Sequence, residues 1–351
     1  MTPIRSFLAC GVLVACSGGP LTETALRNGE APTDASVRDA GSVSAHEPFV
    51  ACTPLAPRTA AVDVAVLPEA GEAPYLSAIA SAKLSIRVMV YQMGYGAILS
   101  ALEDRARAGV TVRVILDASE KGTSKKYFTS LTKAGASVIW SDGQFPYMHA
   151  KVLVVDDSVA VISTGNYAKQ FMLTARDFVA TDRDPEDVQN LAGLFESDWA
   201  RTHPDLACTR LLVAPVNARK RLLDFISGAK SEILVESMQL SDDDTRDAIL
   251  ARQKAGVSIR VILADPSWVD ANFKAAAPLR KAGIDVRWVK VPGIHVKAIV
   301  VDHQAAYMGS ENLSYTSLSK NREVGLLVDD VKNVDLMVNT FERDWAVATN
   351  F

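Results

Sequence analysis

The chain has 351 residues, of which 48% are hydrophobic and 22% are charged. These proportions are typical of a folded globular protein and exclude a disordered or largely membrane-spanning chain, and the length allows two domains, each with its own core. The formal net charge of −4 gives no general signal for polyanion binding, so any basic surface must be local.

The N-terminus is typical of a secretory signal. Arg5 precedes an apolar run over residues 7–15, which is too short to span a bilayer but suits the central region of a signal peptide. The run leads into Cys16 with small residues on both sides, and this pattern resembles the lipobox of bacterial lipoproteins. We therefore expect residues 1–16 to be a signal peptide with a lipobox, whose cleavage leaves Cys16 as the lipid-modified first residue. This anchor would place the mature protein in the bacterial periplasm or at the outer membrane. The alternative is ordinary signal cleavage nearby, with Cys16 incidental.

Residues 17–61 begin with a stretch rich in small and polar residues, which predicts a flexible tether because it offers little apolar surface to bury. The chain has four cysteines. Cys52 and Cys208 remain once the signal region is set aside, and we expect them to form a disulfide in an oxidising compartment. No CxxC or HxxxH spacing is present, so the sequence predicts no metal site.

The first half of the folded region, residues 62–204, alternates predicted strands and helices. Short β-branched runs predict its strands, over residues 86–91, 110–116, 138–140 and 152–156. Helical patterns predict one helix over 97–108, one that ends near Gly135, and a last amphipathic helix that carries Asp198 and Trp199. The strand over 110–116 is almost continuously apolar, as is typical of the middle of a sheet covered on both faces.

The second half, residues 209–351, has the same order of elements. Its predicted strands lie over residues 232–236, 257–263, 286–288 and 298–302. Its predicted helices are one over 245–255, one that ends near Gly283, and a last one that carries Asp344 and Trp345. The alternation predicts that each half is an α/β layered unit with a mixed sheet.

A set of polar residues occurs twice at a constant offset of 146 residues, 295 minus 149. The first copy consists of His149, Lys151, Asp156, Thr164, Asn166 and Asp177, and the second of His295, Lys297, Asp302, Ser310, Asn312 and Glu323. A constant offset over such a span indicates two copies of one structural unit. Residues two apart on a strand face the same side, so each histidine projects beside its lysine. Two cationic groups are poorly suited to a core unless an anion lies between them, so the pattern points to an anion site.

The doubled pattern H-x-K-x4-D-x6-G-[GS]-x-N resembles the phospholipase D superfamily, often called the HKD family, over about residues 62–351. The second copy matches at every position and includes Gly309-Ser310-Glu311-Asn312, followed by Asn321-Arg322-Glu323. The first copy departs from the pattern at Ser163-Thr164-Gly165-Asn166, where a hydroxyl and the asparagine are kept. The resemblance implies two tandem α-β-α sandwich repeats with mixed sheets, related by a pseudo-twofold axis, whose HxK strands meet at one site.

The activity that the resemblance implies is a phosphodiesterase that cleaves phospholipid headgroups, or transfers them to another alcohol, through a phosphohistidine. By analogy His149 is the nucleophile and His295 the acid, although the sequence itself does not choose between them. The remaining implied roles are phosphate binding by Lys151, Lys297, Asn166 and Asn312, hydroxyl donation to substrate by Thr164 and Ser310, orientation of an imidazole by Asp177 and Glu323, and a structural role for Asp156 and Asp302. Two lysines and two imidazoles can manage phosphate charge, so we expect no metal or other cofactor.

Three alternatives stay open at the level of sequence. The first is a nuclease of the same superfamily, against which the slightly acidic composition weighs, since backbone neutralisation needs a basic stripe. The second is a cardiolipin-synthase-like transferase, and the third is a degenerate pair kept as a scaffold or binding protein. Lys121, Lys125 and Lys126 form a small basic cluster that fits either lipid headgroups or nucleic acid, or is simply a solvated loop. Two repeats in one chain supply a complete site, so a monomer is expected to suffice for activity.

Overall fold

The computed structural model describes residues 57–204, 206 and 208–350, which belong to one compact unit. The predicted signal peptide, Cys16 and most of the predicted tether lie outside the described residues. In the described part of the chain, no helix combines the length and apolarity needed to cross a bilayer.

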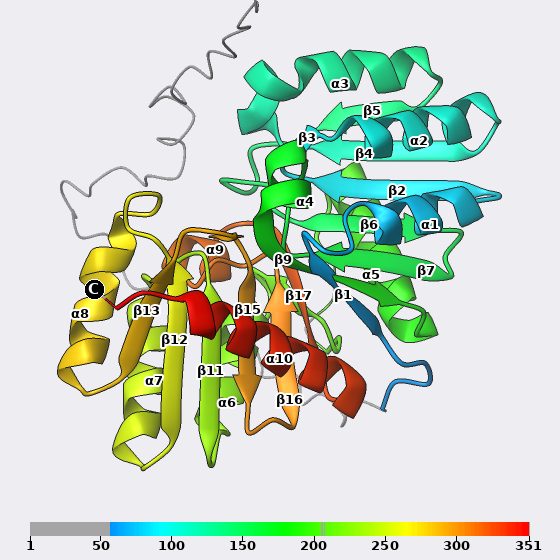
Figure 1. Cartoon of the computed structure of the whole chain (residues 1–351). Helices are drawn as coiled ribbons and strands as arrows, with labels where there is room; N and C mark the ends of the chain where they lie inside the picture. The colour runs from blue at the N-terminus through cyan, green and yellow to red at the C-terminus, as the bar shows by residue number, and fades with distance from the viewer. Residues whose placement is uncertain (1–56, 205, 207, 351) are drawn as a thin grey trace, which may run out of the picture. The chain divides into compact units, whose positions relative to one another are not determined.

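The first sheet is mixed and has the strand order β1-β9-β7-β6-β2-β4-β5 (Figure 1). Its strands are β1 (Asp63–Leu67), β2 (Ser85–Val90), β4 (Thr111–Leu116), β5 (Ser137–Trp140), β6 (Lys151–Val155), β7 (Val159–Ser163) and β9 (Ala175–Asp182). Strands β2, β4 and β5 run parallel, whereas β6, β7, β9 and β1 pair antiparallel. One further strand, β14 (Gly293–Ile294), joins this sheet from the second repeat by pairing with β9.

The second sheet repeats this arrangement, with the strand order β10-β17-β16-β15-β11-β12-β13. Its strands are β10 (Leu212–Ala214), β11 (Glu232–Ser237), β12 (Ser258–Ala264), β13 (Asp285–Val289), β15 (Lys297–Val301), β16 (Ala305–Gly309) and β17 (Glu323–Val328). When each strand is matched to its counterpart in the other repeat, the two orders are identical. The expectation of two α/β repeats with mixed sheets is therefore confirmed.

Helices lie on both faces of each sheet, as Figure 1 shows. In the first repeat they are α1 (Ala73–Ser81), α2 (Gly96–Arg107), α3 (Lys121–Lys133), α4 (Lys169–Thr174) and α5 (Pro185–Ala200). In the second they are α6 (Ala218–Ser227), α7 (Asp243–Lys254), α8 (Ala271–Lys281), α9 (Tyr315–Ser319) and α10 (Val331–Val347). Aspartates begin three of them, because the side chains of Asp184, Asp242 and Asp330 accept hydrogen bonds from backbone N–H groups of the first turn. Three short elements complete the fold, β3 (Met93–Gly94), β8 (Tyr167–Ala168) and the 3-10 turn η3 (Ala118–Glu120).

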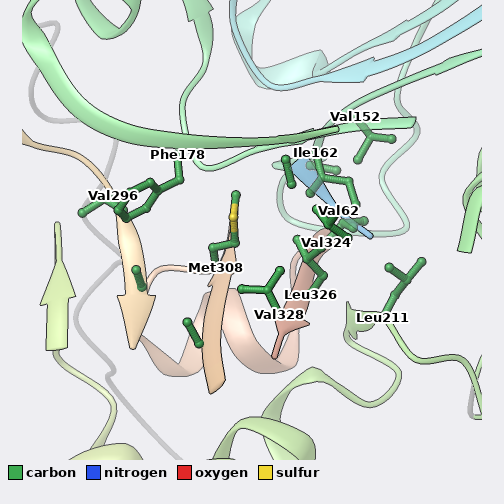
Figure 2. Packing of buried hydrophobic residues seen from close by; sticks show 14 of the residues in the cluster. Val62, Val152, Ile162, Phe178, Leu211, Val296, Met308, Val324, Leu326 and Val328 are labelled. Carbon is green, nitrogen blue, oxygen red and sulfur yellow. The ribbon is translucent and has the colours of Figure 1, made fainter. Parts of the chain in front are cut away.

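The alternation of side chains along each strand divides the interior into layers. On β6, Leu153 and Val155 face the core under α1 and α2, whereas Val152 and Val154 face a second core that both repeats share. Helices α5 and α10 contribute to this shared core, for example through Phe195. Figure 2 shows its residues from both repeats, with Phe178 near Val296 and with Val324, Leu326 and Val328 along one strand. The shared core holds the two repeats together over an apolar surface.

Two buried ion pairs also join the repeats, and they are related by the same offset of 146. Arg176 of β9 donates to Asp344 of α10 through Nε (2.5 Å) and Nη2 (3.0 Å). Arg322, which lies just before β17, pairs with Asp198 of α5 at 2.9 Å. The aspartate of each last helix therefore anchors an arginine of the other repeat.

The predicted elements are present with ends that differ by one or two residues, for example β2 at Ser85–Val90 and α7 at Asp243–Lys254. Cys208 takes part in a disulfide bond. Its expected partner, Cys52, lies outside the described residues, so the pairing of these two cysteines stays a prediction.

Candidate active site

The two histidines of the doubled motif lie where the repeats meet. β6 and β15 begin at Lys151 and Lys297, so each histidine comes two residues before its strand. The backbone N–H of His149 donates to the carbonyl of Arg322 (2.9 Å), and that of His295 donates to the carbonyl of Arg176 (3.2 Å). Each histidine is thus fixed by backbone contacts to the other repeat rather than within its own sheet.

The carboxylates that orient the imidazoles are exchanged between the repeats. His149 Nδ1 donates to Glu323 Oε2 at 2.7 Å, and His295 Nδ1 donates to Asp177 Oδ1 and Oδ2 at 3.0 and 3.1 Å. The sequence predicts that Asp177 and Glu323 each accept from an imidazole, but it does not say which one. Because a carboxylate only accepts, the ring proton lies on Nδ1 and the lone pair on Nε2.

Other donors hold the two carboxylates, and they differ between the repeats. Thr164 Oγ1 donates to Asp177 Oδ1 (2.6 Å), and Ser310 Oγ donates to Glu323 Oε2 (2.7 Å). Both hydroxyls are fully buried. Glu323 accepts two further hydrogen bonds, from Ser317 Oγ and from Asn321 Nδ2.

This geometry bears on the predicted role of Thr164 and Ser310. We predict from sequence that their hydroxyls contact substrate, whereas in the structure both donate to a carboxylate. The same oxygens accept from the backbone N–H groups of Phe178 (2.9 Å) and Val324 (3.0 Å). In this structure the two hydroxyls therefore hold the carboxylates in position, and their contact with substrate stays a prediction.

The lysines of the motif are fully buried beside the imidazoles. Lys151 Nζ donates to the carbonyl of His149, and Lys297 Nζ donates to the carbonyl of His295. Lys297 Nζ also lies 3.4 Å from both ring nitrogens of His295. The two buried lysines supply positive charge beside the imidazoles, which the carboxylates of Asp177 and Glu323 offset, and their N–H groups can donate to a bound anion.

Burial sets the protonation of this cluster. It lowers the pKa of both His149 and His295 to about 4, although Glu323 and Asp177 act in the opposite direction, so both rings are neutral near pH 7 without an anion. Burial also lowers the pKa of Lys297 to about 8 and that of Lys151 well below its usual range. Burial alone would raise the pKa of Glu323, but the His149 imidazole and Lys151 hold it below its usual range.

The two asparagines of the motif have unused hydrogen-bonding capacity. In the described part of the chain, the buried Oδ1 atoms of Asn166 and Asn312 have no hydrogen-bond partner, and Asn166 Nδ2 lies 3.4 Å from Gln92 Oε1. Buried polar atoms without partners are rare in folded proteins, so these amides mark a place for a polar ligand. Rotation of such an amide by 180° presents its N–H groups instead of its oxygen.

The aspartates of the motif lie at the far ends of the HxK strands and serve the fold. Asp156 accepts hydrogen bonds from the backbone N–H groups of residues 83–85 at 2.7–2.8 Å. Asp302 accepts from those of residues 230–232, at 2.7 Å for Ser231 and 2.9 Å for Glu232. In each repeat the aspartate thus fixes the turn before the neighbouring strand, β2 or β11.

Aromatic side chains border the imidazoles, and sequence analysis missed most of them. The ring centroid of Tyr91 lies 4.7 Å from that of His149, and the centroid of Phe171 lies 4.2 Å from that of His295. Trp268 stacks beside His295 with centroids 6.3 Å apart. Apart from Tyr91, which ends the first predicted strand, nothing in the local pattern sets these residues apart from core aromatics.

Glu311 is a further buried carboxyl group that sequence analysis did not single out. Tyr307 Oη donates to Glu311 Oε2 at 2.8 Å, and burial and Glu323 raise the pKa of Glu311 to about 8. Its carboxyl occupies space left by Gly309 and Gly325, where a Cβ would come within 2.1 and 2.8 Å of Oε2. The only sequence signal for it is its place between Ser310 and Asn312 in the motif.

Within the described residues, no group of three or more histidine, cysteine, aspartate or glutamate side chains is arranged to hold a metal ion. What the arrangement offers is a pair of imidazoles oriented through Nδ1, with two lysines and two amides of the same motif. Such a set can bind a phosphate and exchange protons with it.

A family model described as "Cardiolipin synthase, PLD-like domain" matches residues 75–199 and 222–345, one segment in each repeat. The minor cardiolipin synthase ClsB of Bacillus subtilis is 24% identical over 277 residues, which cover 69% of this chain and 70% of that protein. The mitochondrial cardiolipin hydrolase of Homo sapiens is 32% identical over 130 residues, 37% of this chain and 51% of that protein.

Among solved structures, the phosphatidylserine synthase of Haemophilus influenzae has a TM-score of 0.63 at 14% identity, covering 82% of this chain and 87% of that one. At this identity the likeness concerns the fold alone. It covers both repeats, in agreement with the strand orders of the two sheets.

Proposed function

Since the chain belongs to the family of PLD-like (phospholipase D-like) domains, whose model matches both repeats, we propose that it is a phosphodiesterase that cleaves phospholipid headgroups or transfers them to another alcohol. One observation carries the proposal: both imidazoles are held at Nδ1 by a carboxylate of the other repeat, which leaves both Nε2 atoms available beside two buried lysines. Binding at this point would place the phosphorus of a diester between two groups that can attack it and protonate its leaving oxygen.

In the first step of the proposed reaction, His149 Nε2 attacks phosphorus and forms a P–N bond. The bound phosphodiester anion favours the charged form of His295, which takes up a proton at Nε2 before the attack. The P–O bond to the departing alcohol breaks, and His295 Nε2 donates this proton to the oxygen of that alcohol. Lys151 and Lys297, with the amides of Asn166 and Asn312, hold the non-bridging oxygens and stabilise the charge that develops on them. The lysines need to move little, because Nζ of each is already beside its histidine.

In the second step, neutral His295 accepts a proton from water or from a second alcohol as its oxygen attacks phosphorus. The P–N bond breaks and His149 leaves as a neutral imidazole. Water yields hydrolysis and an alcohol yields headgroup transfer, with the same residues in the same roles.

The difference between the two carboxylates favours His149 as the nucleophile. Besides its imidazole, Glu323 accepts from three neutral donors (Ser310, Ser317 and Asn321), whereas Asp177 accepts from one (Thr164), among the described residues. A carboxylate that already accepts several hydrogen bonds has less negative charge to offer an imidazolium. Asp177 is thus the better partner for the charged form of His295, which suits the acid.

The experiment that tests these roles uses two substrates that differ in their leaving group. His295→Ala should lose cleavage of phosphatidylcholine by at least about a hundredfold but retain a burst of p-nitrophenol from a p-nitrophenyl phosphodiester, because this group leaves without a proton. His149→Ala should lose both reactions, and acid-labile phosphate should be trapped on His149 in the His295→Ala protein. A burst retained by His149→Ala instead would reverse the assignment.

The same purified proteins distinguish the other candidate functions. Incubation with single- and double-stranded nucleic acid, in EDTA, tests the nuclease alternative, and nucleotide release without lipid turnover would establish it. Folded wild-type protein that acts on none of the substrates would instead favour a scaffold or binding protein.

We further propose that the chain is exported and anchored at a bacterial membrane through Cys16, on the basis of its lipobox-like N-terminus. Cys16→Ser should shift the protein from the membrane fraction to the soluble fraction and abolish its labelling by radioactive palmitate. Retention of both properties by the variant would contradict the anchor.

A further inference from the structure

The segments that border His295 carry exposed apolar side chains. Leu173 is 42% exposed and lies in α4, two residues after Phe171. Val291 is 82% exposed and precedes Gly293, where a Cβ would come within 3.3 Å of the Trp268 ring. Phe273 is 53% exposed and lies in the first turn of α8, the helix that follows Trp268. We call Leu173, Phe273 and Val291 the apolar rim.

The apolar rim lies close to the candidate site. Each of its three residues belongs to a segment that contacts His295 or leads into it. Phe171 and Trp268 contact the imidazole directly, and Gly293 leads through β14 into His295 itself. Two of these segments belong to the second repeat and α4 belongs to the first. Large apolar side chains exposed from three such segments around one catalytic group mark a surface that another molecule covers.

On the side of His149, the neighbouring segment is basic rather than apolar. Asp117 Oδ2 accepts from the backbone N–H of Met148 at 2.6 Å, which holds η3 and the start of α3 next to His149. Helix α3 has no acidic residue and four exposed lysines, Lys121, Lys125, Lys126 and Lys133. Beside the rim, exposed Lys169, Lys274 and Lys290 outnumber Asp265 and Asp270, and Asp265 already pairs with Lys290 at 3.9 Å.

We infer that the apolar rim and α3 together form a docking surface for an anionic phospholipid bilayer, an inference that rests on the proposed function. The phosphodiester of a bilayer lipid lies below the headgroup and among neighbouring lipids. Apolar side chains at the edge of a protein can enter the boundary between headgroups and acyl chains to a depth of roughly 5–10 Å, which brings a site behind them to the level of the phosphate. Lysines at the same edge attract anionic headgroups over about a Debye length of 8 Å.

The test measures vesicle binding and turnover separately, in the full chain. Leu173→Ser with Val291→Ser should weaken binding to phosphatidylglycerol-containing vesicles by roughly tenfold or more and lower turnover of vesicle lipid in proportion, because two apolar contacts with the bilayer are lost. Hydrolysis of a soluble p-nitrophenyl phosphodiester should not change. All variants keep the same N-terminal segment, so its own membrane affinity cancels in the comparison.

A matched control uses equally exposed apolar residues away from the site. Leu84 (73% exposed) lies beside Asp156 at the far end of the HxK strand, and Val331 (75% exposed) begins α10 after the far end of β17. Leu84→Ser with Val331→Ser should bind vesicles and turn over both substrates as wild type does. Equal loss of binding in this control would overturn the rim as a specific surface.

A second rim variant keeps the test decisive whatever the first does to the fold. Val291→Trp adds apolar area, so it should bind vesicles more tightly, and its added fluorescence should shift to the blue on binding. Unchanged affinity with no fluorescence shift in this variant would overturn the proposal.

The basic part of the surface is tested with Lys125→Glu combined with Lys126→Glu. This variant should lose affinity for phosphatidylglycerol vesicles and keep its activity on the soluble diester. If the variant instead loses affinity for an oligonucleotide and binds vesicles as wild type does, the partner is a nucleic acid and the proposal fails. If the wild-type protein binds vesicles but turns over no lipid, the proposed function alone fails. If it turns over lipid in detergent and the rim variants still bind vesicles as wild type does, the docking surface alone fails.

Discussion

Glu311 gives the site a third buried carboxyl group on one side only, because its counterpart at the same offset is Gly165. When ionised, Glu311 raises the pKa of both lysines of the motif. With a pKa raised to about 8 by burial, it is mostly protonated near neutral pH and adds no negative charge next to a bound phosphodiester. Loss of this proton would add a negative charge where a phosphodiester anion is expected to bind.

Glu311 should make the stability of the fold depend on pH. Its pKa rises from an ordinary 4.5 to about 8 on folding, so between these values the folded chain keeps a proton that the unfolded chain releases. Its contribution to stability thus falls as pH rises through this window. Glu311→Gln should gain stability relative to wild type between pH 5 and pH 9, by on the order of a few kcal/mol. Urea denaturation at pH 5, 7 and 9 measures the difference in the free energy of unfolding between the two proteins. The histidines and lysines are the same in both, so their contributions cancel. A difference that does not change with pH would rule out a buried acid at Glu311.

Thr164 provides a test of positioning against substrate contact. Thr164→Val removes the hydroxyl that donates to Asp177 and leaves a buried acceptor short of a partner, at a cost of about 1–3 kcal/mol. We expect kcat to fall roughly tenfold with little change in KM, and Thr164→Ser to restore kcat. A raised KM with unchanged kcat would return Thr164 to the substrate-binding role predicted from sequence.

At the scale of the candidate site, the residue types could be predicted from sequence because a doubled motif needs no tertiary information to be seen. Which carboxylate serves which imidazole could not be predicted. Asp177 and Glu323 lie 28 residues after the histidines of their own repeats, 177 minus 149 and 323 minus 295, and yet each serves the other. That exchange depends on how two sheets pack, which no local pattern contains. Phe171 and Trp268 were missed for the same reason.

Among the elements, β4 and β12 were predictable because they are apolar along most of their length, as suits strands that pair with a neighbour on both sides. β9 was missed, although it is long, because its sequence includes Arg176, Asp177 and Asp182. Charged residues argue against a central strand unless partners neutralise them. The partner of Arg176 here is Asp344 of the last helix of the other repeat.

The ion pair between β9 and α10 should be costly to break. Asp344→Ala leaves the Arg176 guanidinium buried without its main partner, and we expect a loss of about 3–5 kcal/mol in the free energy of unfolding. Asp335→Ala, at an exposed position of the same helix, should change it by less than about 0.5 kcal/mol. Urea midpoints of the two variants measure both effects, and equal midpoints would show that the pair contributes little.

For the molecule as a whole, the site is built from both repeats of one chain around a shared apolar core. A mixture of His149→Ala and His295→Ala proteins should therefore remain inactive, since no chain in it carries a complete site. Turnover by the mixture, together with a dimer in sedimentation, would instead show that repeats are exchanged between chains and that a monomer does not suffice.

The exchange of carboxylates also bears on how such a protein can change over generations. A duplicated segment usually leaves one copy free to diverge, because the other preserves the original task. Here the acid encoded in one copy orients the ring encoded in the other, so the loss of either acid impairs the histidine of the other copy. Selection therefore acts on the pair as one heritable unit, and the ancestral half could have worked alone only by meeting a second copy of itself.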